Sequence, residues 1–394
     1  MTTVAEHQRA VRALIDEHWH PAVERVPLGA ALGRVLAAGV SSPIDLPPFD
    51  NSQMDGYAVA AGAVAGPLEV TGHVAAGDGV SEFPGGAVAI MTGAPLPRGA
   101  GAVVPVEAVG DAGAFQPVGG SITLQADADA GAFVRTRGSD LAAGDELLPA
   151  GALLGPAQLG ALAASGLAEV PVRARPRVLV ISTGAELSAA GAPLEPGRIY
   201  DANSLSLAAA ITAAGGIALA TAVHSDDPAH FAAALESAGE VDLVVTSGGV
   251  SAGAHEVVRD ALEPRGVRFG AVAMQPGGPQ GLGTIRVAGR ETPVLAFPGN
   301  PVSVLVSFEL FLRPVLRGIR GSQWAPLAAA VDSPEAKHQV RRGRFAADGS
   351  VELVGGPSSH LLVAYARSEL LVHLPVGIGH AAAGDRVEVW RIDD

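Results

Sequence analysis

The feature that most constrains the fold is an alternation of apolar strand patterns and helical patterns that begins near residue 177. The apolar run RVLVIST ends in a polar turn, and SLSLAAAITAAGG follows it as a helical pattern closed by glycine. The runs GIALATAV, VDLVVTSGGVSAG and PVLAFPGNPVS repeat the strand pattern, with helical patterns between them. Strands that alternate with helices predict a doubly wound, mostly parallel sheet. We therefore expect an α/β domain over residues 176–325.

The rest of the chain divides into segments of a different character. Residues 46–144 contain short Val- and Ile-rich runs broken by glycine and proline, which predicts an all-β insert with frequent turns. The flanking segments 1–45 and 145–175 have helical periodicity and predict one helical N-terminal and linker domain. Short strand patterns return over 326–394 and predict a C-terminal β domain. The expected fold class is therefore multidomain α/β, with two additional β domains.

Composition excludes several classes of protein. The 26 basic and 40 acidic side chains give a formal net charge of −14, which argues against non-specific binding to nucleic acid or to an anionic membrane. The sequence has no cysteine, so disulfides, thiolate zinc sites and cysteine nucleophiles are excluded. The charged, amphipathic start differs from a signal peptide, and the longest uncharged stretch, 202–223, is interrupted by a Gly-Gly break. We expect a cytoplasmic protein.

Three loops that follow predicted strands share small residues, hydroxyl groups and backbone N–H groups. STGAEL follows the first strand, TSGGVSAG follows the third, and FPGNPVS follows a later one. Ligands of open α/β sheets bind where the strands end, so these loops predict an anion site. None of the loops matches a Walker A or dinucleotide fingerprint, which disfavours ATP hydrolysis and NAD chemistry. The expected binding residues in these loops are Ser182, Thr183, Gly184, Ser247, Gly248, Gly249, Ser251, Gly299 and Asn300.

Carboxylates lie in or beside the predicted turns, namely Asp55, Asp140, Glu186, Asp226, Asp227 and Glu256. Any one of them alone is better explained as a helix cap or a surface charge. Their association with the glycine-rich loops points instead to a hard divalent cation such as Mg²⁺, which takes carboxylate oxygens together with substrate phosphate oxygens. Such a cation would take its oxygen ligands from among these carboxylates.

Histidine and serine patterns add little. The eleven histidines have no metal-binding spacing, so a histidine-built metal site is not expected. His255, in the third-strand loop, is interpreted either as a ligand contact or as an exposed loop residue. His360 either contacts a ligand or caps a strand end. No G-x-S-x-G elbow indicates a serine hydrolase.

Seven motifs, in order along nearly the whole chain, resemble the molybdopterin molybdenumtransferase family, also called the MoeA or gephyrin E-domain family. The resemblance implies a transferase of molybdenum cofactor biosynthesis that inserts molybdate into adenylylated molybdopterin and releases AMP, with Mg²⁺ as the cation. It also implies a four-domain homodimer, with the site formed where the α/β domain of one subunit faces the β insert of the other. The motifs are PPFDNSQMDGYAV, IMTGAPLPRGAGAVVPVE, RGSDLAAGDELLPAG, STGAEL, GRIYDANS, SGGVSAG and FPGNPVSVLVSFELF.

The resemblance also implies roles for individual residues. Asp55 in the DNSQMDGYA turn is expected at the dimer-interface active site, where stiff prolines and a glycine would hold its carboxylate in place. Asp140, Glu186 and Asp227 complete the expected catalytic set and would place Mg²⁺ on the AMP phosphate. The ligands of the cation that it implies are Glu186, Asp226, Asp227 and Glu256. The further substrate contacts that it implies are Thr92, Gln275, Pro298, Pro301 and Ser359.

Two positions depart from the family pattern in a way that affects charge. Where the family has a Lys-Pro-Gly-Lys-Pro loop, this chain has QPGGP, so Gln275 and Gly278 occupy both lysine positions. Losing a cation from a partly buried anion site costs about 1–4 kcal/mol of attraction per charge pair. Gln275 can still donate hydrogen bonds, and the arginines that are candidates for compensation are Arg137, Arg341 and Arg342.

Acidic positions differ as well, because Ala185 and Gly101 stand where the family has aspartates and Glu256 is one methylene longer than the family's aspartate. These departures keep a binding paralogue open, one that holds molybdopterin without turning it over or with weakened activity. A second alternative is an adenylyltransferase-like step, since residues 177–320 resemble the pterin adenylyltransferase domain. The β insert and the C-terminal β domain argue against that alternative.

Overall fold

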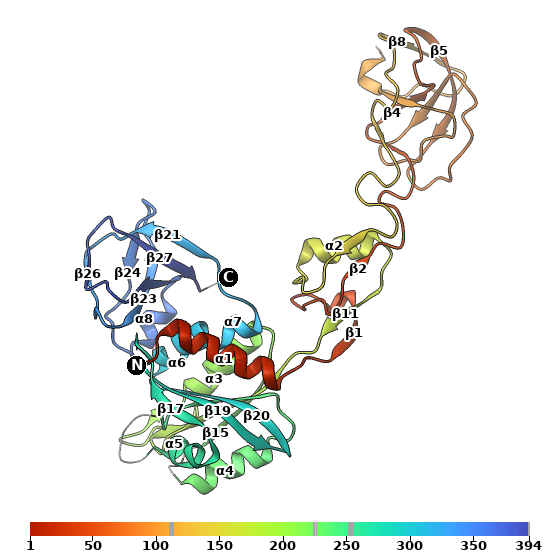
Figure 1. Cartoon of the computed structure of the whole chain (residues 1–394). Helices are drawn as coiled ribbons and strands as arrows, with labels where there is room; N and C mark the ends of the chain where they lie inside the picture. The colour runs from red at the N-terminus through yellow and green to blue at the C-terminus, as the bar shows by residue number, and fades with distance from the viewer. Residues whose placement is uncertain (110–113, 224, 226, 251–255, 393–394) are drawn as a thin grey trace. The chain divides into compact units, whose positions relative to one another are not determined.

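The computed structural model describes residues 1–109, 114–223, 225, 227–250 and 256–392 (Figure 1). It contains two compact units. The large unit comprises Met1–Ala22 and Ala174–Asp394, and the small unit comprises Val23–Arg173. In the described part of the chain, no helix is long and apolar enough to cross a membrane.

A six-stranded sheet lies at the centre of the large unit. Its order is β15-β12-β16-β20-β19-β17; the first four strands are parallel, and β19 and β17 are joined by antiparallel pairing. The doubly wound, mostly parallel sheet expected from the sequence is therefore confirmed, with an antiparallel edge added. The strands are β12 (Arg177–Thr183), β15 (Ile217–Val223), β16 (Leu243–Ser247), β17 (Arg268–Ala271), β19 (Pro279–Val287) and β20 (Arg290–Phe297).

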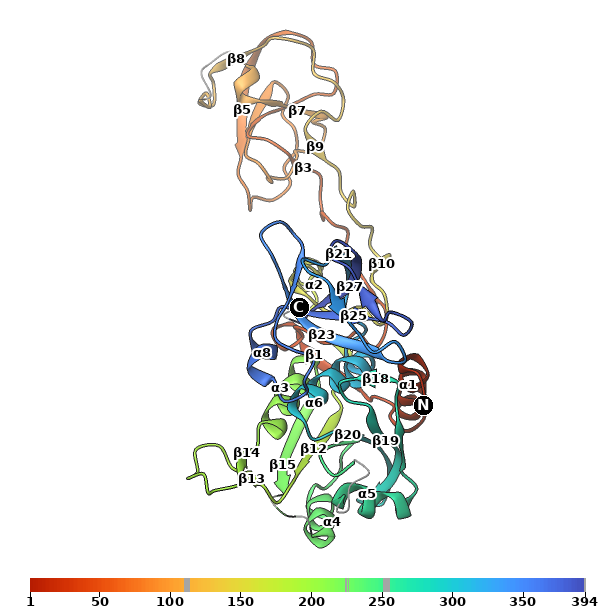
Figure 2. The same ribbon diagram turned by 90° about the vertical axis from the view of Figure 1, so that its left-hand side faces the viewer.

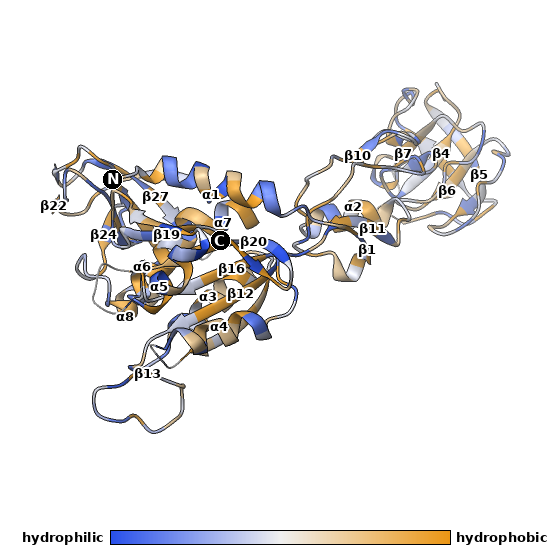
Figure 3. Cartoon of the chain, turned by 60° about the horizontal axis from the view of Figure 1, so that its bottom comes forward, coloured by the Kyte–Doolittle hydropathy of each residue, from blue (hydrophilic) through white to orange (hydrophobic). Residues whose placement is uncertain are grey.

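Both faces of this sheet are covered, which explains the continuous apolar runs. Successive side chains of a strand point to opposite faces, so Val178 and Val180 enter one core while Leu179 and Ile181 enter the other. The first core includes α1, α3 and α6, and the second includes α4 and α5. Figure 3 shows the strands β12, β16 and β20 coloured as hydrophobic. The helices are α1 (Val4–His18), α3 (Asn203–Ala213), α4 (Pro228–Ser237), α5 (Val257–Leu262) and α6 (Pro301–Ser307), with the 3-10 turn η3 (Glu263–Arg265) after α5.

Helix α1 belongs to the large unit, which differs from the expected grouping of 1–45 with 145–175. Its apolar positions Val11 and Ile15 are fully or almost fully buried and pack in the same core as Phe311. The helix begins at a capping box formed by Thr3 and Glu6. An amphipathic helix buries its apolar stripe against the nearest large apolar surface, and here that surface is formed by β20 and the segment after α6. This segment continues through the π-helical turn η4 (Phe308–Leu312) into α7 (Arg313–Leu316).

The small unit contains two parts. In the first part, the only α-helix among the described residues is α2. The N-terminal segment, for which helical periodicity was expected, forms the strand β1 and the short turn η1 here. Strand β1 pairs with β11, and β2 pairs with β10. The elements are β1 (Val23–Pro27), η1 (Leu28–Ala30), β2 (Val40–Ser41), β10 (Glu146–Leu148), α2 (Pro156–Ala164) and β11 (Glu169–Arg173).

The second part of the small unit is the β insert. Its five-stranded sheet has the order β7-β4-β6-β5-β8, and β3 pairs with β9 beside it. Tyr57 lies fully buried in its core, and the Tyr57 hydroxyl accepts a hydrogen bond from Gln116 N at 2.7 Å. The elements are β3 (Asn51–Ser52), β4 (Gly56–Val59), β5 (Gly66–Val74), β6 (Ala87–Ile90), β7 (Ala102–Pro105), η2 (Val106–Ala108), β8 (Ser121–Leu124) and β9 (Val134–Arg135).

The C-terminal sheet of the large unit has the order β18-β23-β25-β27-β21, with β24 paired to β23 (Figure 2). Its edge strand β18 comes from the α/β domain, and Met274 and Gln275 pair in parallel with His338 and Gln339 of β23. The loop between β17 and β19 is therefore part of both domains. The elements are β18 (Met274–Gln275), β21 (Ser322–Pro326), β22 (Val331–Asp332), β23 (His338–Phe345), β24 (Val351–Leu353), α8 (Leu362–Ala366), β25 (Leu370–Leu374), β26 (His380–Ala381) and β27 (Arg386–Arg391).

Burial lowers the pKa of three histidines, of which His7 and His373 are buried and His338 is half-buried. Burial lowers the pKa of His7, whose ring packs edge-on against Phe311, to about 4. Burial, followed by the neighbouring His338, lowers the pKa of His373 to about 3. Burial also lowers the pKa of His338, whose Nε2 lies 3.0 Å from His373 Nδ1. Two imidazoles that share one hydrogen bond need one donor and one acceptor nitrogen, which two neutral rings provide.

These histidines predict a stability that falls in acid. The unfolded chain gains protons on these histidines as the pH drops below about 6.5, whereas in the folded chain His7 and His373 gain theirs only near about pH 4 and about pH 3. Stability is therefore complete above that pH, and each buried histidine removes roughly 1.4 kcal/mol per pH unit on the way down to its folded pKa. Urea unfolding between about pH 7.5 and about pH 5 measures the slope. The variant His7→Phe keeps a ring against Phe311 and is expected to reduce the slope of stability against pH. An unchanged slope would contradict this account.

Candidate functional site

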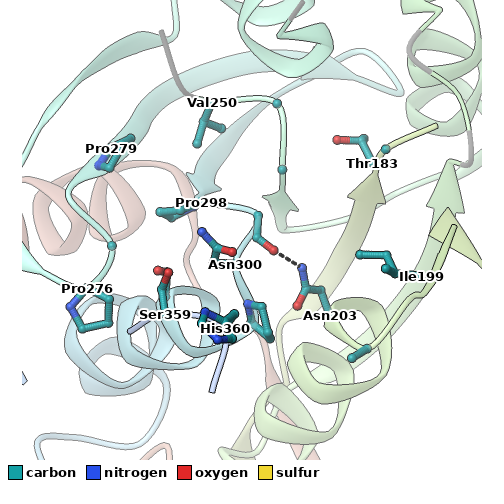
Figure 4. A pocket seen from close by; sticks show the side chains of 18 of the residues that line it. Thr183, Ile199, Asn203, Val250, Pro276, Pro279, Pro298, Asn300, Ser359 and His360 are labelled. Carbon is teal, nitrogen blue, oxygen red and sulfur yellow. Dashed lines mark hydrogen bonds between the residues drawn. The ribbon is translucent and has the colours of Figure 1, made fainter. Parts of the chain in front are cut away.

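A cavity of about 1070 Å³ lies where β12, β16 and β20 end (Figure 4). The loops after these three strands line it, together with the loop before β19 and a C-terminal segment that contains Ser359 and His360. The residues expected from the sequence that line the cavity are Thr183, Gly184, Glu186, Gly248, Gly249, Glu256, Gln275, Pro298, Gly299, Asn300, Pro301 and Ser359.

Close backbone packing explains why two of the loops need glycine. A Cβ on Gly248 would stand 2.6 Å from Thr183 O, and a Cβ on Gly249 would stand 2.9 Å from Val258 N. Both residues also have positive φ angles of 95° and 61°. The Gly248 N–H donates to Phe297 O at 3.1 Å, so the expectation that this N–H holds a ligand is corrected. The glycines bring the strand ends together, and only part of their backbone faces the cavity.

Asp201 accepts hydrogen bonds from several groups beside the cavity, a role that was not expected from the sequence. It is 9% exposed, and its Oδ1 accepts hydrogen bonds from Ser182 Oγ at 3.0 Å, Asn203 N at 2.9 Å and Ser204 N at 3.1 Å. Asn203 then donates through Nδ2 to Gly299 O at 2.7 Å, as Figure 4 shows. The only signal in the sequence was the position of this acid two residues before a helical run, in the motif GRIYDANS.

The same network explains Ser182 and Ser247, which were expected to bind substrate. Both are buried, and Ser247 Oγ donates to Ser182 Oγ at 3.5 Å, while Ser182 Oγ donates to Asp201. Neither residue lines the cavity in the described part of the chain. Their hydroxyl groups form a chain of hydrogen bonds that links the ends of β12 and β16 to Asp201.

The variant Asp201→Ala is expected to lower the free energy of unfolding by about 1–3 kcal/mol, because three donors lose their acceptor. It is also expected to disturb Asn203 and, through it, the loop at Gly299. The variant Asp201→Asn keeps an oxygen at Oδ1 and should lose less. Chemical denaturation of both variants tests the ranking; equal losses would show that the acceptor oxygen is not what matters.

The carboxylates expected to bind a metal do not share one environment. Glu186 lines the cavity, and its carboxylate lies over Gly184, where an added Cβ would stand 2.5 Å from Oε2. Glu256 precedes α5 and also lines the cavity. Asp227 is the N-cap of α4 and accepts from Ala229 N at 2.8 Å, so it serves as a cap and does not reach the cavity lining.

The two carboxylates that line the cavity, Glu186 and Glu256, suit a cation site that is completed by the ligand. Among the residues described, no three His, Asp or Glu side chains gather as a preformed metal site. Mg²⁺ commonly takes one or two carboxylates and completes its shell with water and substrate phosphate oxygens. Glu186 and Glu256 therefore fit a cation that binds together with a phosphorylated ligand. Asp226, Ser251 and His255 lie outside the described residues.

Asp55 and Thr92 form a pair within the β insert. Asp55 Oδ1 accepts from Thr92 N at 2.7 Å and from Thr92 Oγ1 at 2.8 Å, and these two hydrogen bonds lower the pKa of Asp55. Gly56 is required beside it, because a Cβ there would stand 2.2 Å from Val104 O. Asp140 lies elsewhere in the small unit, where it lines a second cavity of about 610 Å³. The structure therefore joins Asp55 to Thr92 but not to Asp140.

Three family profiles match consecutive parts of the chain. Residues 2–166 match the MoeA N-terminal region (domain I and II), residues 179–318 match a probable molybdopterin binding domain, and residues 324–392 match the MoeA C-terminal region (domain IV). The chain belongs to the MoeA family. The resemblance and the fold class expected from the sequence are thereby confirmed.

Named relatives are similar to this chain over most or all of its length. Molybdopterin molybdenumtransferase 2 of Mycobacterium tuberculosis is 46% identical over 417 residues and covers 100% of both chains. The molybdopterin molybdenumtransferase of Nostoc is 34% identical over 94% of this chain and 88% of its own length. A crystal structure of a molybdopterin biosynthesis MoeA protein from Pyrococcus horikoshii, 26% identical, superposes with a TM-score of 0.82 over 99% of this chain and 100% of its own. Another, 32% identical, has a TM-score of 0.77 and covers 99% of each chain.

Formal charge at the wall of this MoeA chain's cavity comes, among the described residues, from acidic side chains. No lysine or arginine is among the described residues that line it. Arg341 and Arg342, the candidates for compensation, are buried and donate to Gly355 O and Gly356 O respectively, so they hold the backbone of the segment that leads to Ser359. Arg137 lies in the small unit and forms an ion pair with Asp45. None of the three candidate arginines is among the described residues that line the cavity.

His360 is the only basic side chain among the described lining residues. Its Nδ1 lies 2.9 Å from Ser358 Oγ, and the neighbouring Ser359 accepts through its carbonyl oxygen from Val302 N at 3.0 Å. This hydrogen bond holds the Ser359 segment of the C-terminal domain at the start of α6. Backbone N–H groups, hydroxyl groups and amides, rather than formal positive charge, provide the donors of this cavity.

Proposed function

We propose that the protein is a cytoplasmic enzyme that transfers molybdenum from molybdate to adenylylated molybdopterin, with release of AMP. The observation that carries the proposal is the cavity at the ends of β12, β16 and β20, with two carboxylates and many neutral donors at its wall. It lies within residues that match a probable molybdopterin binding domain, in a chain whose full-length relatives are named molybdopterin molybdenumtransferases.

The chemistry proposed requires several anions to meet. Molybdate, the dithiolene and the phosphoanhydride all carry negative charge, so the site must supply fixed donors in a water-poor cavity. Thr183, Ser359 and the amide of Asn300 are polar groups that line this cavity. Glu186 and Glu256 would hold Mg²⁺ through their carboxylate oxygens, and the bound cation would neutralise charge on the AMP phosphate. The carboxylates would also repel a ligand that arrives without its cation.

The proposal extends to a homodimer, in which the Asp55–Thr92 pair of one subunit completes the cavity of its partner. The support is that Asp55 is ionised and oriented by two hydrogen bonds but has no role in the core of the insert. Light scattering tests the dimer. A sharper test mixes two inactive variants, Asp55→Asn and Glu186→Gln, under conditions of subunit exchange. Sites shared between subunits should recover about a quarter of the wild-type activity, since half of the dimers are mixed and each has one intact site. No recovery would contradict the sharing.

The deciding experiment measures AMP release from adenylylated molybdopterin with Mg²⁺, in the presence and absence of molybdate. Release that depends on molybdate supports the proposal. Tight binding without release would replace it by the carrier alternative, which the lack of cationic lining residues favours. AMP transfer from ATP to molybdopterin without molybdate would replace it by the adenylyltransferase-like alternative.

A further inference from the structure

The side-chain amide of Gln275 has a fixed orientation at the cavity wall. Gln275 lines the cavity, and its strand β18 pairs with β23 of the C-terminal domain. On β23, Gln339 is 2% exposed, and its Nε2 donates to Gln275 Oε1 at 2.7 Å. The oxygen end of the Gln275 amide is therefore occupied, and its N–H end remains available for another acceptor.

The opposite orientation of the two amides would be less stable. If Gln275 donated to Gln339 instead, the buried NH₂ group of Gln339 would lose its acceptor. In the observed orientation the atom without a partner among the described residues is Gln339 Oε1. Buried carbonyl oxygens without a partner are tolerated better than buried N–H groups without one. The environment of Gln339 thus determines which end of Gln275 faces away from it.

The loop that carries Gln275 is also held in place. Gln280 is 3% exposed, and its Nε2 donates to Gly277 O at 2.7 Å and to Ser307 Oγ at 2.8 Å. Gly277 takes a positive φ of 93° in this turn. A donor on a fixed loop binds without the entropy cost of ordering a long flexible side chain.

We propose that Gln339 is a positioning residue, which holds the amide of Gln275 so that its N–H group donates to an oxyanion in the cavity. This inference rests on the proposed function and identifies the oxyanion as either molybdate or a phosphate of adenylylated molybdopterin. The neutral amide of Gln275 then donates a hydrogen bond at the position where the family pattern has a lysine. Each hydrogen bond to a charged acceptor is worth roughly 10- to 100-fold in affinity.

The variant Gln339→Glu separates orientation from packing. When the introduced carboxyl group is ionised it can only accept, so Gln275 must turn and donate to it, which presents the oxygen of Gln275 to the oxyanion. When the introduced carboxyl group is protonated it can donate as the native amide does, which restores the original orientation. The KM for one of the two substrates is expected to rise about 10- to 100-fold at high pH and to return towards the wild-type value as the pH falls.

The surroundings of residue 339 define the range of pH to study. Burial raises the pKa of a carboxyl at this position, whereas Arg341, two residues along the same strand face, favours its ionised form. Burial lowers the pKa of the nearby His338 and His373, and the partner of Gln339 on the neighbouring strand β25 is Leu374, which carries no charge. Measurements from about pH 6.5 to about pH 9 cover the titration of a buried carboxyl. Wild-type protein, with two neutral amides, provides the reference profile.

Three further variants complete the test. Gln339→Met preserves size but releases Gln275, and is expected to raise the same KM without adding a pH dependence. Gln275→Met removes the donor and should match the high-pH value of Gln339→Glu. Gln323→Glu makes the same change at an exposed position of the same sheet and should leave both KM values unchanged. Thermal unfolding of each variant verifies that it is folded.

The result identifies the oxyanion and can overturn the inference. A rise confined to the KM for molybdate assigns molybdate, and a rise confined to the KM for adenylylated molybdopterin assigns its phosphate. If wild-type protein releases AMP in a molybdate-dependent way and folded Gln339→Glu has the wild-type KM values at every pH, the positioning role is wrong. If wild-type protein shows no molybdate dependence, the proposed function fails instead. In that case, equilibrium binding of molybdate to wild-type protein and to Gln339→Glu decides the positioning role independently.

Discussion

Replacing Glu309 by alanine is expected to lower the free energy of unfolding by about 3–5 kcal/mol, because two buried arginines would lose their counter-charge. Glu309 is 6% exposed within the π-helical turn η4. Arg320 contacts both of its carboxylate oxygens, with Nε 2.7 Å from Oε2 and Nη2 3.1 Å from Oε1. Arg313 Nε lies 3.7 Å from Oε2. Equilibrium unfolding in guanidinium chloride measures the loss.

The matched control is Glu352→Ala on the surface of the C-terminal sheet. Glu352 also accepts two hydrogen bonds from one arginine, Arg344, but both side chains are about half exposed. Exposed ion pairs contribute about 0–1 kcal/mol, so the control should change little. If the two variants lose the same amount, burial is not what gives the Glu309 cluster its importance.

Replacing Glu186 by glutamine is expected to reduce molybdate-dependent AMP release by about 10²–10³-fold with little change in stability. The backbone around it is held by other groups: Ile199 N donates to Glu186 O at 2.8 Å, and Arg198 Nη1 donates to Ala185 O at 2.6 Å. The short strands β13 (Leu187–Ser188) and β14 (Ile199–Tyr200) pair beside it. The carboxylate is therefore free to serve the cavity rather than the fold.

The control for this prediction is Glu195→Gln, an exposed acid in the loop between β13 and β14 that pairs with Arg198. It should retain wild-type release. A second variant, Gly184→Ala, should resemble Glu186→Gln in direction, because the new methyl group would displace the Glu186 carboxylate. Near-normal rates for Glu186→Gln, in a protein of normal stability, would remove this residue from the proposed catalytic set.

The sequence predicts the α/β sheet and its three loops because their signals are local. Apolar runs that end in glycine-rich turns place Thr183, Gly248 and Gly299 at one sheet edge, whatever the rest of the chain does. The amphipathic pattern of α1 predicts a helix equally well. It does not predict which surface covers that helix, and for this reason the expected grouping of the first 22 residues differs from the structure.

The remaining differences come from pairs that are distant in sequence. Asp201 accepts hydrogen bonds from Ser182 and Asn203, and Asn203 in turn donates to Gly299. Gln339 donates to Gln275, which lies 64 residues away in the sequence. A single sequence does not indicate that two neutral residues such as Gln275 and Gln339 are in contact. It also does not indicate which of the 40 acidic residues accepts hydrogen bonds from distant groups. Asp227 shows the reverse case, in which an acid beside a promising loop is a helix cap. Local chemistry alone does not distinguish a cap from a ligand.

The two-residue strand β18 has a consequence for engineering and for divergence among relatives. Because it supplies the edge of the C-terminal sheet, the C-terminal domain is not an interchangeable module. A chimera that received this domain from a relative would place an unselected side chain against Gln275. Residues 275 and 339 should therefore be transplanted together, and substitutions at one position should be inherited with compensating substitutions at the other.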